Sequence, residues 1–150
     1  MLRHHMDSNV VIGVFIFKDD DTREACKNYC TAIGHRYEGF LSIVSAGEIA
    51  KIFGSIPERL AREEAFIFLS DFIFRQKVRI VGIEESDIIL ARELKPMNHL
   101  CDIPELVSLA VAIRQNAEVF MTLDEEMLNE RFRGEVQKLY RIAIQKPRYD

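Results

Sequence analysis

Acidic residues stand at junctions between apolar segments in four separate parts of the chain. These residues are Asp7, Glu48, Glu105 and Asp124. Each lies where the sequence predicts that a strand meets a helix, and ligands of open α/β sheets bind at the carboxyl ends of the strands. We therefore expect the four carboxylates to converge at that edge and to hold a divalent metal. Oxygen ligands without clustered His or Cys favour Mg2+ or Mn2+ over zinc.

Metal-assisted hydrolysis is the chemistry that such a cluster supports. One ion lowers the pKa of a bound water and a second ion stabilises the leaving oxygen, so no Ser/His/Asp arrangement is needed. A phosphodiester is the natural substrate, because its anionic oxygens bind metal and its transition state gains negative charge. Ser8 and Thr122 are predicted to orient a carboxylate or the phosphate by hydrogen bonds. The alternative for each is a turn hydroxyl.

Each acidic residue also has a purely structural interpretation. Asp7 and Asp124 are suited to capping a turn or a helix, and Glu48 could be one more solvated acid on a helix. Asp102 and Glu105 have the spacing of a capping box, which would explain both without a metal. The ordered set favours a metal site over these separate explanations. It leaves the third ligand as Glu105, Asp102 or both.

Strands alternate with helices along the chain, and this alternation positions the acids. Apolar and β-branched runs predict strands at 40–44, 78–83, 118–121 and 140–145, and residues 10–17 also have strand propensity. Amphipathic segments bounded by capping residues, glycine or proline predict helices at 22–34, 46–53, 57–75, 87–94 with Ser86 as its cap, 102–116, and from residue 125. Such alternation indicates a mostly parallel sheet with helices on both faces.

The length and composition fit one globular domain. The chain has 150 residues, 48% of them hydrophobic, and we expect residues 1–150 to form a single domain with a buried core. Its net charge of -4 argues against a large basic surface of the kind that wraps duplex DNA. RNA stays compatible with this charge, because a metal bound to the carboxylates would reverse the local field that a phosphate meets.

The cysteines and the apolar runs bear on the cellular compartment. Cys26, Cys30 and Cys101 are odd in number and lack the spacing of a metal ribbon, which predicts buried thiols in a reducing compartment. The longest apolar run, residues 10–17 with its one glycine, is far shorter than the roughly 20 residues that cross a bilayer. The polar, charged N-terminus lacks the pattern of a signal peptide. We therefore expect a cytoplasmic protein that does not enter the membrane.

Four short motifs occur in order along the chain. They are Met-Asp-Ser-Asn-Val at 6–10, Ser-Ala-Gly-Glu-Ile at 45–49, Glu-Leu-Val-Ser-Leu-Ala-Val-Ala at 105–112 and Thr-Leu-Asp at 122–124. Together they resemble the motifs of the PIN domain, a family of metal-dependent ribonucleases that includes the VapC-type toxins. The corresponding family motifs are Asp-Thr-Asn-Val, a second motif with a glutamate, Asp-Ala-x-x-x-Ala-x-Ala and Thr-x-Asp. Glutamate at position 105 departs from the aspartate that is usual there.

The resemblance implies both a fold and an activity. The fold is a three-layer α/β/α PIN-like domain with a central, mostly parallel five-stranded sheet. In the family the segment after the first motif's aspartate is helical, which makes residues 2–6 the first strand. The activity is that of an endoribonuclease that cleaves RNA with Mg2+ or Mn2+, as in the toxin of a toxin–antitoxin pair. The metal ligands implied are Asp7, Glu48, Glu105 and Asp124.

The first strand has an unusual sequence for its position. Leu-Arg-His-His-Met at 2–6 is polar for a central strand. An origin of His4 and His5 in an expression tag is therefore an open alternative to a native strand.

Two further segments point to partners. Residues 65–74 are apolar around more of a helix than one core face requires, which suggests a homodimer interface or a surface for an antitoxin helix. Deep burial in the core is the alternative. The C-terminal part carries basic residues that could contact an RNA backbone or form a solvated face. They are Arg131, Arg133, Lys138, Arg141, Lys146 and Arg148.

Two other functions compete with the nuclease. A PIN-like module that has lost catalysis and only binds a partner would fit the glutamate at position 105. A phospho-receiver domain would explain residues 10–17 followed by Lys-Asp-Asp-Asp at 18–21, together with Lys95-Pro96. The receiver is the weaker interpretation, because it needs an acceptor aspartate after its third strand. No aspartate occurs between Glu48 and Asp71.

Overall fold

A five-stranded parallel sheet forms the centre of the protein in a computed structural model that describes residues 1–17 and 19–148. The strands follow the order β3-β2-β1-β4-β5, and every neighbouring pair is parallel. Their bounds are β1 Leu2–Met6, β2 Tyr37–Ser42, β3 Arg79–Val81, β4 Val119–Met121 and β5 Ala143–Gln145. The α/β/α fold with a five-stranded sheet that the resemblance implies is confirmed.

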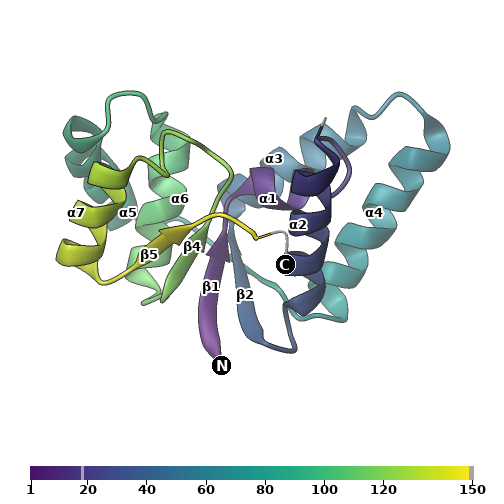
Figure 1. Cartoon of the computed structure of the whole chain (residues 1–150), viewed down its shortest axis with the longest axis horizontal. Coiled ribbons are helices and arrows are strands. Elements are labelled where there is room, and N and C mark those ends of the chain that lie inside the picture. Colours follow the sequence, from purple (N-terminus) through teal and green to yellow (C-terminus); the bar gives the residue numbers. More distant parts are fainter. Residues whose placement is uncertain (18, 149–150) are drawn as a thin grey trace.

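Helices cover both faces of this sheet (Figure 1). The helices are α1 Ser8–Ile12, α2 Asp20–Ala32, α3 Ile43–Gly54, α4 Arg59–Phe74, α5 Glu85–Leu94, the short 3-10 helix η1 Lys95–Met97, α6 Ile103–Arg114 and α7 Glu130–Tyr140. The first four lie on one side of the sheet, and α5, α6 and α7 lie on the other. No helix in the described part of the chain is both long and apolar enough to span a bilayer.

Each face of the sheet has its own apolar core. On one side, Val10, Ile49, Phe53 and Phe72 pack with the strand residues that point toward them. On the other side, Leu106, Leu109, Phe132 and Val136 pack over Phe120. Burial on both faces explains why β4, Val-Phe-Met, is an apolar run instead of an alternating pattern.

The histidines of β1 are buried inside the sheet. β1 pairs with β2 on one side and with β4 on the other, so residues 2–6 form the central strand, as the resemblance implies. The His4 ring stacks on Tyr37 at 4.0 Å between centroids, and the His5 ring stacks on Phe40 at 5.1 Å. Burial lowers the pKa of His4 to about 4 and that of His5 to about 3, so both rings are neutral.

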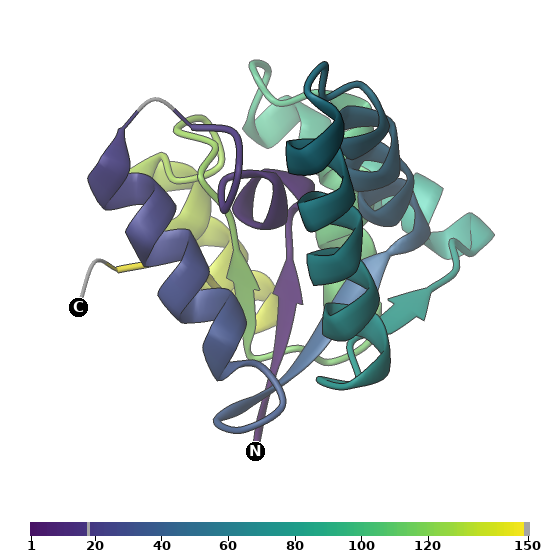
Figure 2. The same ribbon diagram turned by 90° about the vertical axis from the view of Figure 1, so that its right-hand side faces the viewer.

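The segment after Asp7 is helical, and its strand propensity is overridden. Residues 8–12 form α1, which Figure 2 shows at the carboxyl end of β1 between α2 and α4. Val10 and Val11 are fully buried there, so their apolar character serves packing and not a strand. Gly13 follows, and a side chain on it would lie 2.9 Å from Asn9 O and Cys26 Sγ, which only glycine avoids.

This arrangement removes the basis of the receiver interpretation. That interpretation needs a first strand at 10–17, where the described structure has α1 and a turn. Asp19, which would belong to the acidic pair, instead caps α2 by accepting a hydrogen bond from Asp21 N. Lys18 lies outside the described residues.

Several predicted boundaries are corrected by capping side chains. β2 ends at Ser42, two residues before the predicted strand end, because Ser42 Oγ accepts a hydrogen bond from Ser45 N and caps α3. α5 begins at Glu85 with a capping box between Glu84 and Asp87, so Ser86 is not its cap. The predicted box formed by Asp102 and Glu105 at the start of α6 is confirmed.

The last helix and strand are both shorter than predicted. α7 begins at Glu130, where Asn129 Oδ1 accepts from Phe132 N, and not at residue 125. It ends at Tyr140, and Arg141 adopts a left-handed conformation with φ of 58°. The chain reverses there, so β5 begins only at Ala143.

Candidate metal site

Asp7 is the best-buried carboxylate at the carboxyl edge of the sheet. It directly follows β1 and caps α1, with Oδ1 accepting a hydrogen bond from Ser8 N at 2.8 Å. Oδ2 accepts from Thr122 Oγ1 at 2.9 Å and from Asn9 Nδ2 at 3.4 Å. The side chain is 4% exposed. The structural interpretation as a cap is therefore correct, and the same geometry fixes the carboxylate in place.

Thr122 links Asp7 to Asp124. It follows β4, the neighbour of β1 in the sheet, and it is fully buried. Its Oγ1 donates to Asp7 and accepts from Asp124 N at 3.0 Å. Asn9 strengthens the link, because its Oδ1 accepts from Leu123 N at 3.0 Å. Two ends of parallel strands are thus joined by side chains, and both carboxylates lie at the same edge.

Glu48 approaches this edge from α3. Ser8 Oγ donates a hydrogen bond to Glu48 Oε2 at 2.7 Å, which joins the first residue of α1 to α3. Its charge is close enough to Asp7 to raise the pKa of that residue. Ser8 therefore orients a carboxylate, while Glu48 itself is exposed to solvent.

Glu105 faces Asp124 from the first turn of α6. Carboxylate oxygens of these two residues and the sulfur of Cys101 all lie within 4.8 Å of one another. Glu105 also accepts from Asp102 N at 3.3 Å as part of the capping box. Asp102 is exposed and is not a member of the cluster in the part of the chain that is described. Of the two alternatives for the third ligand, the structure brings Glu105 to Asp124.

Cys101 is a member of this cluster that sequence reasoning missed. It is fully buried, and burial raises the pKa of its thiol to about 12, with further increases from the charges of Asp124 and Glu105. The only signal in the sequence is its position four residues before Glu105, one helical turn away. The sequence identified it as a buried thiol, which the structure confirms for all three cysteines.

The carboxylates repel one another and hold protons. Burial is the main cause that raises the pKa of Asp7 to about 6, opposed by the hydrogen bonds from Thr122 and Ser8 and assisted by the charges of Glu48 and Asp124. Burial also raises the pKa of Glu105 to about 8, followed by its hydrogen bond with Asp124 and the charge of Asp124. Such pairs of acids at one place are unfavourable unless a proton or a cation is shared between them.

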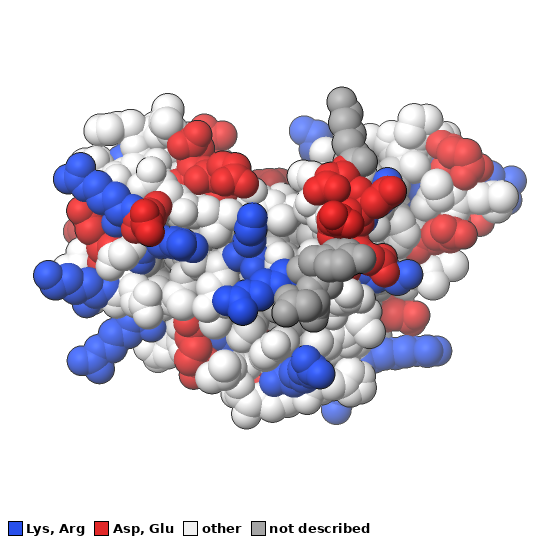
Figure 3. Space-filling model, in the orientation of Figure 1, with Lys and Arg blue, Asp and Glu red and all other residues white. Residues whose placement is uncertain are grey.

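No basic side chain neutralises this edge in the described residues. None of the ion pairs found there involves Asp7, Glu48, Glu105 or Asp124. Figure 3 shows acidic side chains gathered over the loop after β4 and over the start of α2, on both sides of a hollow. The donor set of several carboxylate oxygens therefore fits a hard divalent cation such as Mg2+ or Mn2+. The Cys101 sulfur adds one softer donor.

Comparisons with known proteins identify the class of fold. No protein-family model matches the sequence, and no curated protein matches it either. Solved structures do match, and the fold is that of the PIN domain. At these low sequence identities the similarity defines the fold only, and the activity has to be argued from the residues of the site.

The similar structures include members of toxin–antitoxin systems. One is a chain of VapBC2 from Rickettsia felis, in a structure that also holds a DNA fragment from the VapBC2 promoter. It matches with a TM-score of 0.65 and 12% identity, over 97% of this chain and 98% of that chain. A chain of FitAcB from Neisseria gonorrhoeae matches with a TM-score of 0.65 and 13% identity, over 95% of this chain and 96% of that chain. A chain of VapBC-5 from Mycobacterium tuberculosis matches with a TM-score of 0.63 and 13% identity, over 97% of this chain and 99% of that chain.

Proposed function

We propose that this protein is a Mg2+- or Mn2+-dependent endoribonuclease that cleaves RNA phosphodiester bonds, and that it is the toxin of a toxin–antitoxin pair. The observation that carries the proposal is the convergence of Asp7, Thr122, Asp124 and Glu105 at the carboxyl edge of β1 and β4. Their order in the sequence matches the PIN motifs, and their placement matches the edge at which open α/β sheets bind ligands.

In this proposal each side chain has a separate role. Asp7, Asp124 and Glu105 hold the cation, and Glu48 extends the carboxylate set from α3. Thr122 and Ser8 keep two of these carboxylates in one orientation through hydrogen bonds of 2.9 and 2.7 Å. When bound, a metal at such a site lowers the pKa of a water nucleophile and neutralises charge on the phosphate.

Protons must leave before a cation can enter. Glu105 and Asp7 have raised pKa values, so a fraction of each is protonated near neutral pH. Metal binding therefore releases protons and becomes more favourable as the pH rises. This coupling follows from the residues of the chain and does not depend on which RNA is cleaved.

The exposed face of α4 is the proposed surface for the antitoxin. Ala65 and Phe72 on the inner side of α4 are fully buried, but other apolar residues of the segment are exposed. The alternative that the whole apolar segment lies in the core is therefore wrong. Ile67 and Phe74 are 62% and 78% exposed, and Phe66 is 40% exposed. Solved structures similar in fold include a toxin–antitoxin complex and a member of the VapBC family of toxin–antitoxin systems, which favours an antitoxin here. A homodimer through the same face is the second candidate.

RNA cleavage by the purified chain is the direct test. We expect cleavage of single-stranded RNA with Mg2+ or Mn2+, none with EDTA, and none by Asp7→Asn. Glu105→Gln should lose activity, while the matched variant Glu93→Gln on the exposed side of α5 should keep it. Full activity of Asp7→Asn would refute the assignment of the site.

Metal binding separates the nuclease from a PIN-like module without catalysis. Calorimetric titration with Mn2+ should give a signal for the native chain and a much weaker one for Asp7→Asn. Absence of binding at millimolar Mn2+ would favour the module that only binds a partner. The three buried, free thiols and an RNA substrate together fit a protein of the cytoplasm.

A further inference from the structure

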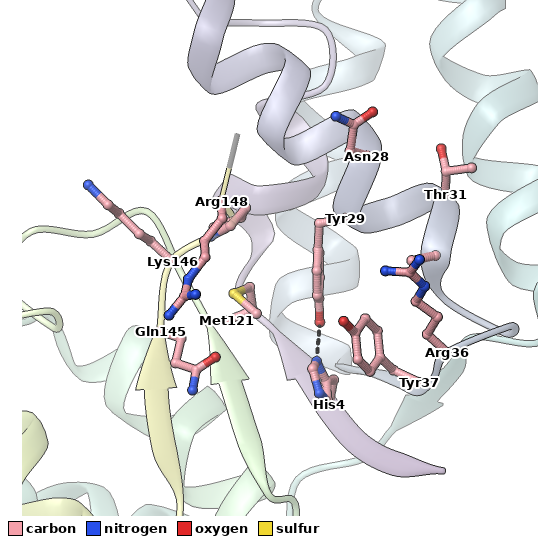
Figure 4. Close-up of a pocket in the computed structure, with 12 residues that line it drawn as sticks. His4, Asn28, Tyr29, Thr31, Arg36, Tyr37, Met121, Gln145, Lys146 and Arg148 are labelled. Atoms are coloured by element: carbon pink, nitrogen blue, oxygen red, sulfur yellow. Dashed lines mark hydrogen bonds between the residues drawn. The ribbon is translucent and has the colours of Figure 1, made fainter. Parts of the chain in front are cut away.

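A cavity whose lining contains none of the acids of the edge lies beside α2 and the end of β5. Its volume is about 770 Å3, within the range of about 300–1,000 Å3 that small-molecule sites occupy. Figure 4 shows that it opens between α2 and the segment that follows β5. Residues of β1, α2, the loop before β2 and residues 145–148 line it. None of the proposed metal ligands is among them.

The charged residues in this lining are all basic. Figure 4 shows Arg36 on the α2 side and Arg148 on the strand side, with Tyr29 and Met121 between them, while Lys146 lies near Arg148. No carboxylate lines the cavity, and none of these three cations forms an ion pair within the described part of the chain. Cations around a hollow whose own lining has no carboxylate attract an anion. Guanidinium groups bind phosphate through two parallel hydrogen bonds.

Aromatic rings form the inner wall of the same cavity. Tyr37 stacks on His4 at 4.0 Å and on Tyr29 at 5.9 Å between ring centroids. Tyr37 is only half-buried, so part of its ring faces the open space. Its hydroxyl points toward the side of Tyr29 and Arg148 in Figure 4. A flat aromatic ligand gains stacking energy on such a wall.

One polar atom of this wall has no partner. His4 Nδ1 shares a hydrogen bond of 2.8 Å with the Tyr29 hydroxyl, but His4 Nε2 is buried without a hydrogen bond within the described structure. Buried polar atoms are usually satisfied, and an unpaired one is a common mark of a missing ligand or water. Because Nε2 is itself shielded from solvent, a ligand in the cavity meets the stacked rings of this wall and not that atom.

We propose that this cavity binds a nucleoside phosphate, with the phosphate held between Arg36 and Arg148 and the base against Tyr37. The ligand is either a free nucleotide or one nucleotide of an RNA strand. Lys146 and Arg148 also line a neighbouring hollow that reaches Leu123 and Glu125, the residues on either side of Asp124. That hollow carries acids, so the segment 146–148 divides an acidic region from a basic one.

Calorimetry on the full chain in EDTA tests the proposal without metal or cleavage. The probes are adenosine 5′-monophosphate, adenosine, inorganic phosphate and a short single-stranded RNA. We expect the monophosphate to bind more tightly than adenosine or phosphate. Arg36→Gln should weaken it by about tenfold or more, as for loss of a charged hydrogen bond. The matched variant Arg92→Gln, an exposed arginine on α5, should leave it unchanged.

Two further variants separate the phosphate from the base. Arg148→Gln should act like Arg36→Gln, and both residues are exposed, so neither change should disturb folding. Tyr37→Leu should weaken the monophosphate by about fivefold or more, as for loss of base stacking, while phosphate binding is kept. Tighter binding of RNA than of the monophosphate assigns the cavity to the RNA strand, and the reverse order assigns it to a free nucleotide.

Three results would overturn the proposal. The first is that adenosine 5′-monophosphate does not bind at millimolar concentration. The second is that adenosine or inorganic phosphate binds as tightly as the monophosphate. The third is that Arg92→Gln weakens binding of the monophosphate as much as Arg36→Gln does. The metal site has no part in these measurements. A chain without nuclease activity could therefore still bind the nucleotide, and an active nuclease could fail to bind it in this cavity.

Discussion

The acidic edge and the basic cavity involve the same strands, β1 and β4, but they carry opposite charges and differ in how their charged side chains are held. β1 supplies His4 to the cavity and leads into Asp7, and β4 supplies Met121 to the cavity and leads into Thr122. At the edge, hydrogen bonds between side chains hold the carboxylates in place. In the cavity, the cations are exposed and only the aromatic wall is packed. A rigid acidic set suits a metal, and flexible cations around a wall suit an organic anion.

Asp7→Asn should separate the two regions most completely. The substitution keeps the side-chain shape and the hydrogen bond from Ser8 N, but it removes the buried charge that would bind the cation. We expect RNA cleavage to fall by about a hundredfold or more, because a direct metal ligand should matter more than its supports. Monophosphate binding in EDTA should stay unchanged. Loss of both activities together would mean that the regions form one site.

Thr122→Val tests whether the edge depends on its hydrogen bonds. The change removes the donor to Asp7 and the acceptor of Asp124 N, and it leaves a similar volume in the core. Activity with Mn2+ should fall by about 10–100-fold, the usual effect of losing a group that orients a metal ligand. Thr122→Ser keeps the hydroxyl and should restore most of the activity. Equal defects in the two variants would indicate a packing effect.

Stability against pH should report on the buried titrating groups of the edge and of β1. Asp7 has a pKa of about 6 in place of 3.8, and Glu105 has one of about 8 in place of 4.5. The folded protein therefore holds these two protons more tightly than the unfolded chain, which lowers stability as the pH rises through 4 to 8. His4 and His5, with pKa values of about 4 and about 3 in place of 6.5, act in the opposite direction below about pH 6.5, so the net loss of stability in the metal-free protein should fall between about pH 6.5 and 8. Mn2+ should offset this loss, with a larger increase in Tm at pH 8 than at pH 5.

Thermal unfolding in EDTA and in Mn2+ measures this dependence. Asp7→Asn should make stability rise more steeply between pH 4 and 6, because it removes an acid whose raised pKa opposes the effect of the two histidines. Arg36 and Arg148 should add nothing to this curve, since arginine stays charged throughout, whereas His4 of the cavity wall contributes to it. Equal stabilisation by Mn2+ at pH 5 and pH 8 would contradict the raised pKa values.

Cys101→Ser should have the smallest effect and should sharpen the nature of the edge. The thiol is a soft donor beside two hard ones, so its removal should lower affinity for Cd2+ more than affinity for Mg2+. Cleavage with Mg2+ or Mn2+ should change little. A large loss of Mn2+-dependent activity in a variant that still folds would place the Cys101 sulfur among the metal ligands.

Much of the fold was predictable because local chemistry determines it. The capping box of Asp102 and Glu105, the strand at 118–121 and the alternation of elements all follow from residue types and spacing. The errors came from capping side chains that compete with propensity. Ser42 ends β2 early, Glu84 replaces Ser86 as the cap of α5, and Asn129 delays the start of α7.

The order of the acids was present in the sequence, but their contacts were not. Motif spacing placed Asp7, Glu48, Glu105 and Asp124 at ends of elements, which suffices to expect one edge. The sequence could not choose between Asp102 and Glu105, because both lie in the same turn. That choice depends on which side of α6 faces the loop after β4, and the structure turns Glu105 to Asp124.

The sequence by itself determined the classes of elements, their order and the positions of the motifs, because these depend on neighbouring residues. Only the tertiary structure decided what residues far apart do together. It buried His4 and His5 in the central strand, placed Cys101 beside two acids, and set Arg36 across a cavity from Arg148. Parallel strands are joined by long crossovers, so the groups that meet at their edges and faces are distant in the chain.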